Sequence, residues 1–228
     1  MKRILMVAFA ALAVAVPQLA EAANPQQAVN DAATAAQSLS TGSGIAANAR
    51  DLLRRARGVM IIPTLVKGGF FFGGQGGTGV LLSRDPRTGS WSYPAFYAMG
   101  AGSFGLQIGL EVSRIMLIIM NEKALNAVMQ SEFKIGGEAG IAVVTLGGGA
   151  EASTTAAGGA DIYALAESQG LFGGVAIQGG IVKPEVGNDH AYYGPNVTAQ
   201  DIVLRRTARN PGAETLRTVL RQAAGAQG

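Results

Sequence analysis

The sequence contains no cysteine, one histidine and one tryptophan among its 228 residues. The lack of cysteine excludes disulfides, thiol catalysis, cysteine-ligated zinc and the acylated cysteine of a lipoprotein. With only one histidine as well, we expect no metal site and no metal cofactor. Attachment to a membrane would therefore have to come from the folded surface or from an amphipathic segment.

Residues 1–22 have the three parts of a secretory signal peptide. Lys2 and Arg3 give a positive start, residues 4–16 are apolar, and Ala20-Glu21-Ala22 places small residues at a cleavage site. The apolar stretch is shorter than the ~20 residues that a membrane-spanning helix needs. The segment looks like a bacterial signal peptide, so we expect an exported protein that is periplasmic or secreted.

Charged residues are also scarce, at 14% of the chain. The formal net charge is +3, and it falls to +2 when residues 1–22 are left out, with 16 basic against 14 acidic residues. A nucleic-acid-binding domain usually carries a pronounced basic face. We therefore expect no nucleic acid as a partner, and the local distribution of charge becomes more informative than its total.

Glycine is abundant, with 33 residues, and hydrophobic residues make up 48% of the chain. Short apolar runs separated by turn residues predict strands, at 59–63, 70–72, 80–82, 115–120, 134–135, 140–146, 162–167 and 171–182. Strict alternation from Phe104 to Val112, with both of these residues on the apolar face, predicts one half-buried strand. Helices are expected at 25–40, 45–57, 121–130, 199–208 and 211–223, with Asn121 and Thr198 as N-caps.

The stretch GGFFFGGQGGTG at 68–79 contains the spacing G-x-G-x-x-G at Gly74, Gly76 and Gly79. In a dinucleotide site this motif leads into a helix whose N-terminus holds the pyrophosphate. Here it leads into the apolar run 80–82, which predicts a strand. We therefore expect no nucleotide, and we interpret these glycines as strand glycines at bulges, bends or close backbone contacts.

Motifs for catalysis are scarce as well. His190 follows Asp189, but no G-x-S-x-G motif accompanies the pair, and no calcium-binding loop is present. We assign no catalytic residue and expect a protein that is not an enzyme. A hydrolase that uses Asp189 and His190 stays open as a minor alternative.

Two segments are candidates for contact with lipid. The predicted helix 45–57 carries Arg50, Arg54, Arg55 and Arg57. These arginines fit a solvated helix end, where the helix dipole favours cations, and they also fit a surface for anionic lipid. The run Phe70–Phe72 fits membrane insertion, although its pattern favours a core strand.

Several segments together resemble the SYLF-domain family of lipid-binding proteins, over about residues 45–222. The resemblance is carried by ARGVMIIP at 56–63, GTGVLL at 77–82, GSWSYP at 89–94, GSFGLQIG at 102–109, FKIG at 133–136, SQGLFGGV at 168–175 and YYG at 192–194. The family's usual turn after its F-K-x-G strand and its frequent Glu-Gly near Gln178 are altered here.

The resemblance implies binding of phospholipid, above all of anionic headgroups, while some family members also bind actin. For an exported protein we carry over only the lipid binding. It falls on Arg50, Arg54, Arg55 and Arg57, and then on Lys67. Phe70, Phe71 and Phe72 are a second candidate, for insertion into the membrane. An anionic phospholipid membrane surface is the expected partner, and protein partners stay unknown.

The expected fold is α+β, with a glycine-rich, mainly antiparallel, curved or barrel-like sheet flanked by N- and C-terminal helices. After the signal peptide at 1–22, we expect a helical segment or linker at 23–44 and one SYLF-like domain at 45–224. The expected function is non-enzymatic, peripheral binding of anionic membranes through a basic amphipathic helix. The alternative is a small outer-membrane β-barrel or structural envelope protein, which alternating strands and glycine content favour.

Overall fold

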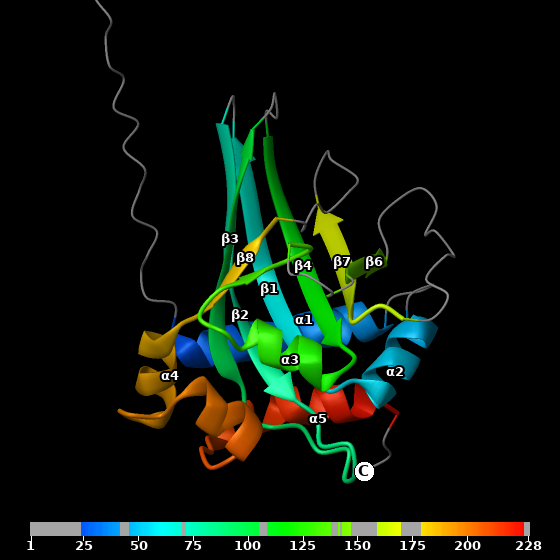
Figure 1. The fold of residues 1–228 in the computed structure, drawn as a ribbon, viewed down its shortest axis with the longest axis vertical. Helices are drawn as coiled ribbons and strands as arrows, with labels where there is room; N and C mark the ends of the chain where they lie inside the picture. The colour runs from blue at the N-terminus through cyan, green and yellow to red at the C-terminus, as the bar shows by residue number, and fades with distance from the viewer. Residues whose placement is uncertain are drawn as a thin grey trace, which may run out of the picture.

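The computed structural model describes residues 24–41, 46–69, 72–104, 109–137, 141, 143–146, 159–169 and 179–225. These residues form a strongly curved eight-stranded sheet in the order β5-β8-β3-β2-β1-β4-β7-β6, with helices packed around its lower half (Figure 1). Every neighbouring pair of strands is antiparallel except β6 and β7. The expected α+β fold is confirmed.

The strands are β1 Gly58–Gly69, β2 Phe72–Ser83, β3 Ala95–Phe104, β4 Gly109–Ile119, β5 Phe133–Lys134, β6 Val143–Leu146, β7 Ile162–Gln169 and β8 Ile181–Pro184. The α-helices are α1 Pro25–Thr41, α2 Ala46–Arg55, α3 Glu122–Val128, α4 Val186–Tyr193 and α5 Glu214–Ala223. A π-helix, η1 Asp201–Arg205, and a 3₁₀-helix, η2 Pro211–Ala213, precede α5.

The central strands are buried on both faces in their lower half. Along β1, Val59 and Ile61 point into one core, while Met60 and Ile62 point into the other. The apolar runs of β2 and β4 divide between the two cores in the same way. Continuous rather than alternating apolar runs are the sequence signature of such two-sided burial, which explains the runs at 59–62, 80–82 and 115–119.

Helices α1, α2 and α5 cover the first face. The contact side of α1 consists mainly of alanines, which let the helix axis lie close to the strands. Its buried residues belong to the same core as Leu53 of α2 and Leu216 of α5. Helix α1 is therefore an integral layer of the fold.

The second face is covered by α3, β5 and η1. Helix α3 buries Ala124, Leu125 and Val128 against the sheet, and η1 buries Ile202 and Val203. The predicted N-cap of α3 is confirmed, because the Ala124 amide donates to the Asn121 side-chain oxygen at 2.9 Å. Two separate parts of the chain thus close this side of the core.

The predicted helix 199–208 is shorter than expected. Thr198 caps it as predicted, since the Asp201 amide donates to the Thr198 hydroxyl at 3.2 Å. The helix ends at Arg205, and Arg206 adopts a left-handed conformation with φ of 57°. This local reversal turns the chain back toward the end of β2, a contact that no local pattern signals.

The single strand predicted from Phe104 to Val112 is wrong. Phe104 ends β3 and Gly109 begins β4, so the run divides between two antiparallel strands, while residues 105–108 lie outside the described residues. The predicted apolar face is also wrong at Val112, because Val112 is 38% exposed whereas Glu111 is buried. Alternation identifies two faces, but it does not say which face other elements cover. Most of the predicted strand 171–182 also lies outside the described residues, and β8 begins at Ile181.

Two glycines of the string, Gly77 and Gly79, are explained by a bulge in β1. The pairing of β1 with β2 shifts register between Ile61 and Val66, and β1 presses there on the backbone of β2. A Cβ on Gly77 would overlap the Thr64 carbonyl oxygen, and one on Gly79 would lie 2.6 Å from the Ile61 carbonyl oxygen. These glycines therefore permit a close backbone contact.

We expect Gly79→Ala to lower the free energy of unfolding by roughly 2–3 kcal/mol, because the methyl group cannot be accommodated without moving β1. Gly102→Ala is the matched control, since a Cβ there has no atom within 4 Å. Urea unfolding of both variants measures the effect. Equal stability of the two variants would contradict the close-contact explanation.

Asp189 on α4 is the most deeply buried carboxylate among the described residues, at 1% exposure. One of its oxygens accepts the Phe96 amide of β3 at 2.9 Å, and the other has no hydrogen-bond partner among the described residues. Burial raises the pKa of Asp189 to about 7, and the charge of Glu185 adds to this rise. The native state therefore favours the protonated carboxyl.

Because the native pKa of Asp189 lies above its unfolded value of about 4, its contribution to stability is greatest below pH 4 and is lost as the pH rises toward 7. Asp189→Asn keeps the acceptor for Phe96 without a charge. Relative to the wild type, this variant should gain roughly 2–3 kcal/mol in unfolding free energy between pH 4.5 and 7.5. Urea unfolding at both pH values checks this, with exposed Asp31→Asn as control. A constant difference between variant and wild type would refute it.

Candidate functional site

The arginines of α2 lie on its exposed side. Arg50, Arg54 and Arg55 are exposed, whereas the opposite side of the helix is buried in the first core. The buried residues are Ala49, Leu52, Leu53 and Ala56. The helix is amphipathic as predicted, but its apolar face packs against the protein. Only the arginine face is therefore presented to a partner.

Lys67 lies far from these arginines. Arg57 directly precedes β1 and Lys67 lies near its other end, which places them roughly 30 Å apart at about 3.3 Å per strand residue. Phe70 and Phe71 lie outside the described residues, and Phe72 begins β2 with no description of its side chain. The predicted lipid-binding residues are thus divided between the two ends of the molecule.

The structure surrounds α2 with arginines that the sequence analysis did not group with it. We call this surface the arginine base. It consists of Arg50, Arg54, Arg57, Arg84, Arg87, Arg206, Arg217 and Arg221. Its members come from α2, the residue before β1, the turn after β2, the residue after η1, and α5, at the lower end of the molecule in Figure 1.

Close contacts connect the members of the arginine base. The end of α5 meets α2, since a Cβ on Gly225 would lie 3.6 Å from Arg50 and 3.9 Å from Arg54. Burial lowers the pKa of Arg84, and the charges of Arg54 and Arg57 lower it further. Arg54 and Arg57 are therefore near enough to Arg84 to repel its charge.

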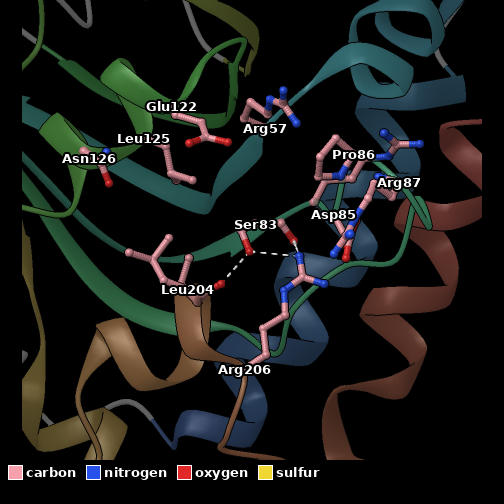
Figure 2. Close-up of a pocket in the computed structure, with 12 residues that line it drawn as sticks. Arg57, Ser83, Asp85, Pro86, Arg87, Glu122, Leu125, Asn126, Leu204 and Arg206 are labelled. Carbon is pink, nitrogen blue, oxygen red and sulfur yellow. Dashed lines mark hydrogen bonds between the residues drawn. The ribbon is translucent and has the colours of Figure 1, made fainter.

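A cavity of about 330 Å³ opens at the centre of the arginine base. It lies between the end of β2, the turn at 85–87, the start of α3 and the end of η1. Arg57, Arg84, Arg87 and Arg206 line it, and Figure 2 shows Arg57 and Arg206 on opposite sides with Ser83 between them.

Two carboxylates and several uncharged residues complete the lining of this cavity. The carboxylates are those of Asp85 and Glu122. Asp85 accepts the backbone amides of Arg87 at 2.8 Å and Thr88 at 3.2 Å, and these bonds hold its pKa below the usual range. Asp85 thus stabilises its own turn, and positive charge predominates in the cavity.

Arg206 is held in place by the end of β2. Its guanidinium donates to the Ser83 hydroxyl at 3.1 Å and to the Ser90 hydroxyl at 3.2 Å, and also to both backbone carbonyls. Ser83 is itself buried and donates to the Val203 carbonyl at 2.5 Å. A side chain with this many bonds is a fixed positive charge, which suits recognition of anions.

A second cavity, of about 390 Å³, lies between the turn at 84–91 and α5. Here Arg217 already has an anionic partner, because it donates to Glu214 at 2.6 Å and lies over the Tyr93 ring at 4.4 Å from its centroid. The Tyr93 hydroxyl also donates to Glu214, and together these bonds lower the pKa of the carboxyl. The positive charge of the second cavity is thus partly neutralised by Glu214.

Asp189 and His190 do not form a catalytic pair. They are consecutive on α4, so their side chains point in different directions. His190 is exposed, while Asp189 is buried against Phe96. Within the described residues, no group of three histidines or carboxylates is arranged to hold a metal ion. None of the helices in the described ranges is long and apolar enough to cross a bilayer.

The amino-acid sequence of this chain matches a known protein family. The family described as "Ysc84: Las17-binding protein actin regulator" matches residues 100–223. This chain belongs to the Ysc84 family. The predicted resemblance to SYLF-domain proteins is thereby confirmed, since Ysc84 and SYLF denote the same family.

The relatives include yeast and human proteins. LAS seventeen-binding protein 3 of Saccharomyces cerevisiae is 34% identical over 175 residues, which are 75% of this chain and 37% of the yeast protein. Protein YSC84 of the same yeast is 33% identical over 74% of this chain and 36% of its own length. SH3 domain-containing YSC84-like protein 1 of Homo sapiens is 29% identical over 74% of this chain and 49% of its own length. This chain therefore spans half or less of these relatives.

We expect Arg206→Lys to lower the free energy of unfolding by about 1–3 kcal/mol, because a lysine keeps the charge but cannot bridge Ser83 and Ser90 at once. Arg209→Lys, at an exposed position nearby, is the control for the effect of replacing an arginine by a lysine. Urea unfolding measures both. If the two variants are equally stable, the bonds of Arg206 do not hold η1 against β2.

Proposed function

We propose that this protein is a non-enzymatic, peripheral binder of anionic phospholipid surfaces and that the arginine base makes the contact. The observation that carries this proposal is the gathering of eight arginines at one end of the molecule. Three carboxylates line the same cavities, namely Asp85, Glu122 and Glu214. Positive charge is therefore concentrated locally in a chain whose net charge is small.

The geometry of α2 favours electrostatic contact over insertion. Because Leu52 and Leu53 are buried in the core, this helix offers the membrane guanidinium groups and no apolar stripe. Each arginine close to an anionic surface contributes about 1 kcal/mol. A few such contacts would hold the protein reversibly, and added salt would release it.

The proposed location is the periplasm, with secretion as the other destination of an exported chain. This part of the proposal rests on the tripartite pattern of residues 1–22. We carry no protein partner over from the relatives. Their names describe binding by proteins of which this chain spans half or less.

The processed protein, from residue 23, should sediment with vesicles of phosphatidylcholine and phosphatidylglycerol but not with phosphatidylcholine alone. The bound fraction should fall steeply between 50 and 300 mM sodium chloride, because the Debye screening length shortens from about 13 Å to about 6 Å over this range. Co-sedimentation across this series measures both properties. Failure to bind either vesicle would refute the proposed function, and binding that ignores salt would refute the electrostatic mechanism.

Arg50→Gln combined with Arg54→Gln should weaken vesicle binding by roughly 30-fold, since two contacts of about 1 kcal/mol each are lost. Lys134→Gln with Lys183→Gln removes the same charge from β5 and β8 and should have a small effect. Lys67→Gln tests the other end of the molecule separately. A larger loss from Lys67→Gln than from the arginine pair would move the contact surface to that end.

A further inference from the structure

Two arginines that line the first cavity each have one side-chain nitrogen that is buried and unpaired. These nitrogens are Nη1 of Arg57 and Nε of Arg84, and neither has a hydrogen-bond partner among the described residues. Buried N–H groups in folded proteins almost always have an acceptor. Both atoms are closed off from solvent, so a ligand in the cavity would reach the other nitrogens of the two guanidinium groups. Two guanidinium groups with incomplete hydrogen bonding beside one cavity favour a ligand that carries negative charge.

The charges around this cavity favour an anion as well. Arg84 is crowded by Arg54 and Arg57, and its burial removes solvent that would otherwise stabilise its charge. Asp85 is engaged by the amides of its own turn. An anion in the cavity would relieve the repulsion among the arginines. The second cavity has less need of an anion, because Glu214 already pairs with Arg217 there.

The Arg206 side chain and the backbones of Arg57 and Arg84 are held in place by hydrogen bonds within the protein. Arg206 is bound to Ser83 and Ser90, while the Arg57 carbonyl accepts the Arg84 amide at 2.8 Å and so joins the backbones of the two residues. A preorganised set of donors binds more tightly than a mobile one, because less conformational entropy is lost.

We infer that this cavity binds one phosphate monoester group, with Arg57 and Arg84 donating to its oxygens and Arg206 supplying a fixed third charge. A monoester carries up to two negative charges and three strong acceptor oxygens. A diester has one charge and two terminal oxygens, so it satisfies fewer of these donors. The phosphate belongs either to a lipid headgroup or to a soluble ester, and the lipid source rests on the proposed function.

Glycerol 3-phosphate is the soluble probe, titrated at constant ionic strength and followed by amide chemical shifts. We expect saturable binding at one site. Arg84→Gln and Arg57→Gln should each weaken it by about tenfold or more, because a charge-assisted bond is lost. Glu122→Gln should tighten it about threefold, because an opposing charge at the cavity is removed. Arg209→Gln, which removes one exposed arginine outside the arginine base, should change it less than twofold.

Thermal unfolding of each variant shows whether it is folded. If either Arg84→Gln or Arg57→Gln does not fold, the other variant still tests the site. Absence of saturable binding by the wild type would overturn the inference. So would equal losses in Arg84→Gln and Arg209→Gln, since these would indicate diffuse attraction. An unchanged affinity in Glu122→Gln would place the probe elsewhere.

Vesicles distinguish the two sources of phosphate. With a lipid headgroup as ligand, vesicles containing phosphatidic acid should bind more tightly than phosphatidylglycerol vesicles of equal surface charge, and Arg84→Gln should abolish that preference. If glycerol 3-phosphate binds but no vesicle does, the phosphate site stands with a soluble ester and the proposed function fails. If vesicles bind and glycerol 3-phosphate does not, the proposed function stands and the phosphate site fails.

Discussion

Burial of the central strands on both faces is the constraint on which the rest of this structure depends. The lower halves of β1, β2 and β4 are apolar on both sides, so each side needs a cover. Helices α1, α2 and α5 supply one cover, while α3 and η1 supply the other. Because these covering elements come from both ends of the chain, two-sided burial brings residues near 50 and near 220 to the same end of the sheet.

The arginine base follows from that arrangement. The core uses the apolar sides of α2 and α5, so their arginines remain at the surface beside the turn that follows β2. Arg206 joins them because η1 must bury Ile202 and Val203 before the chain reverses. Gathering like charges opposes stability. Burial lowers the pKa values of Arg84 and Arg206, and neighbouring arginines lower them further. Such a conflict between local electrostatics and the fold is typical of a functional site.

The glycines show that one sequence spacing can have different structural roles, depending on the elements around it. The spacing at Gly74, Gly76 and Gly79 matches a dinucleotide motif, yet all three lie within β2. At Gly79 the reason is steric, since the bulged backbone of β1 occupies the place of a side chain. The strand prediction after this motif was correct because it depended on the local apolar run. The bulge that explains the glycine involves a different strand.

The sequence by itself determined the fold class, most helices and the strands with continuous apolar runs, because local propensity and hydrophobic periodicity act over a few residues. It also supplied the family resemblance and the arginines of α2. Tertiary structure alone decided that the apolar face of α2 is buried, that Glu111 rather than Val112 points inward, and that Arg84 and Arg206 join Arg57 in one cavity. Those outcomes depend on contacts between residues as far apart as Ser83 and Arg206, and no local pattern records them.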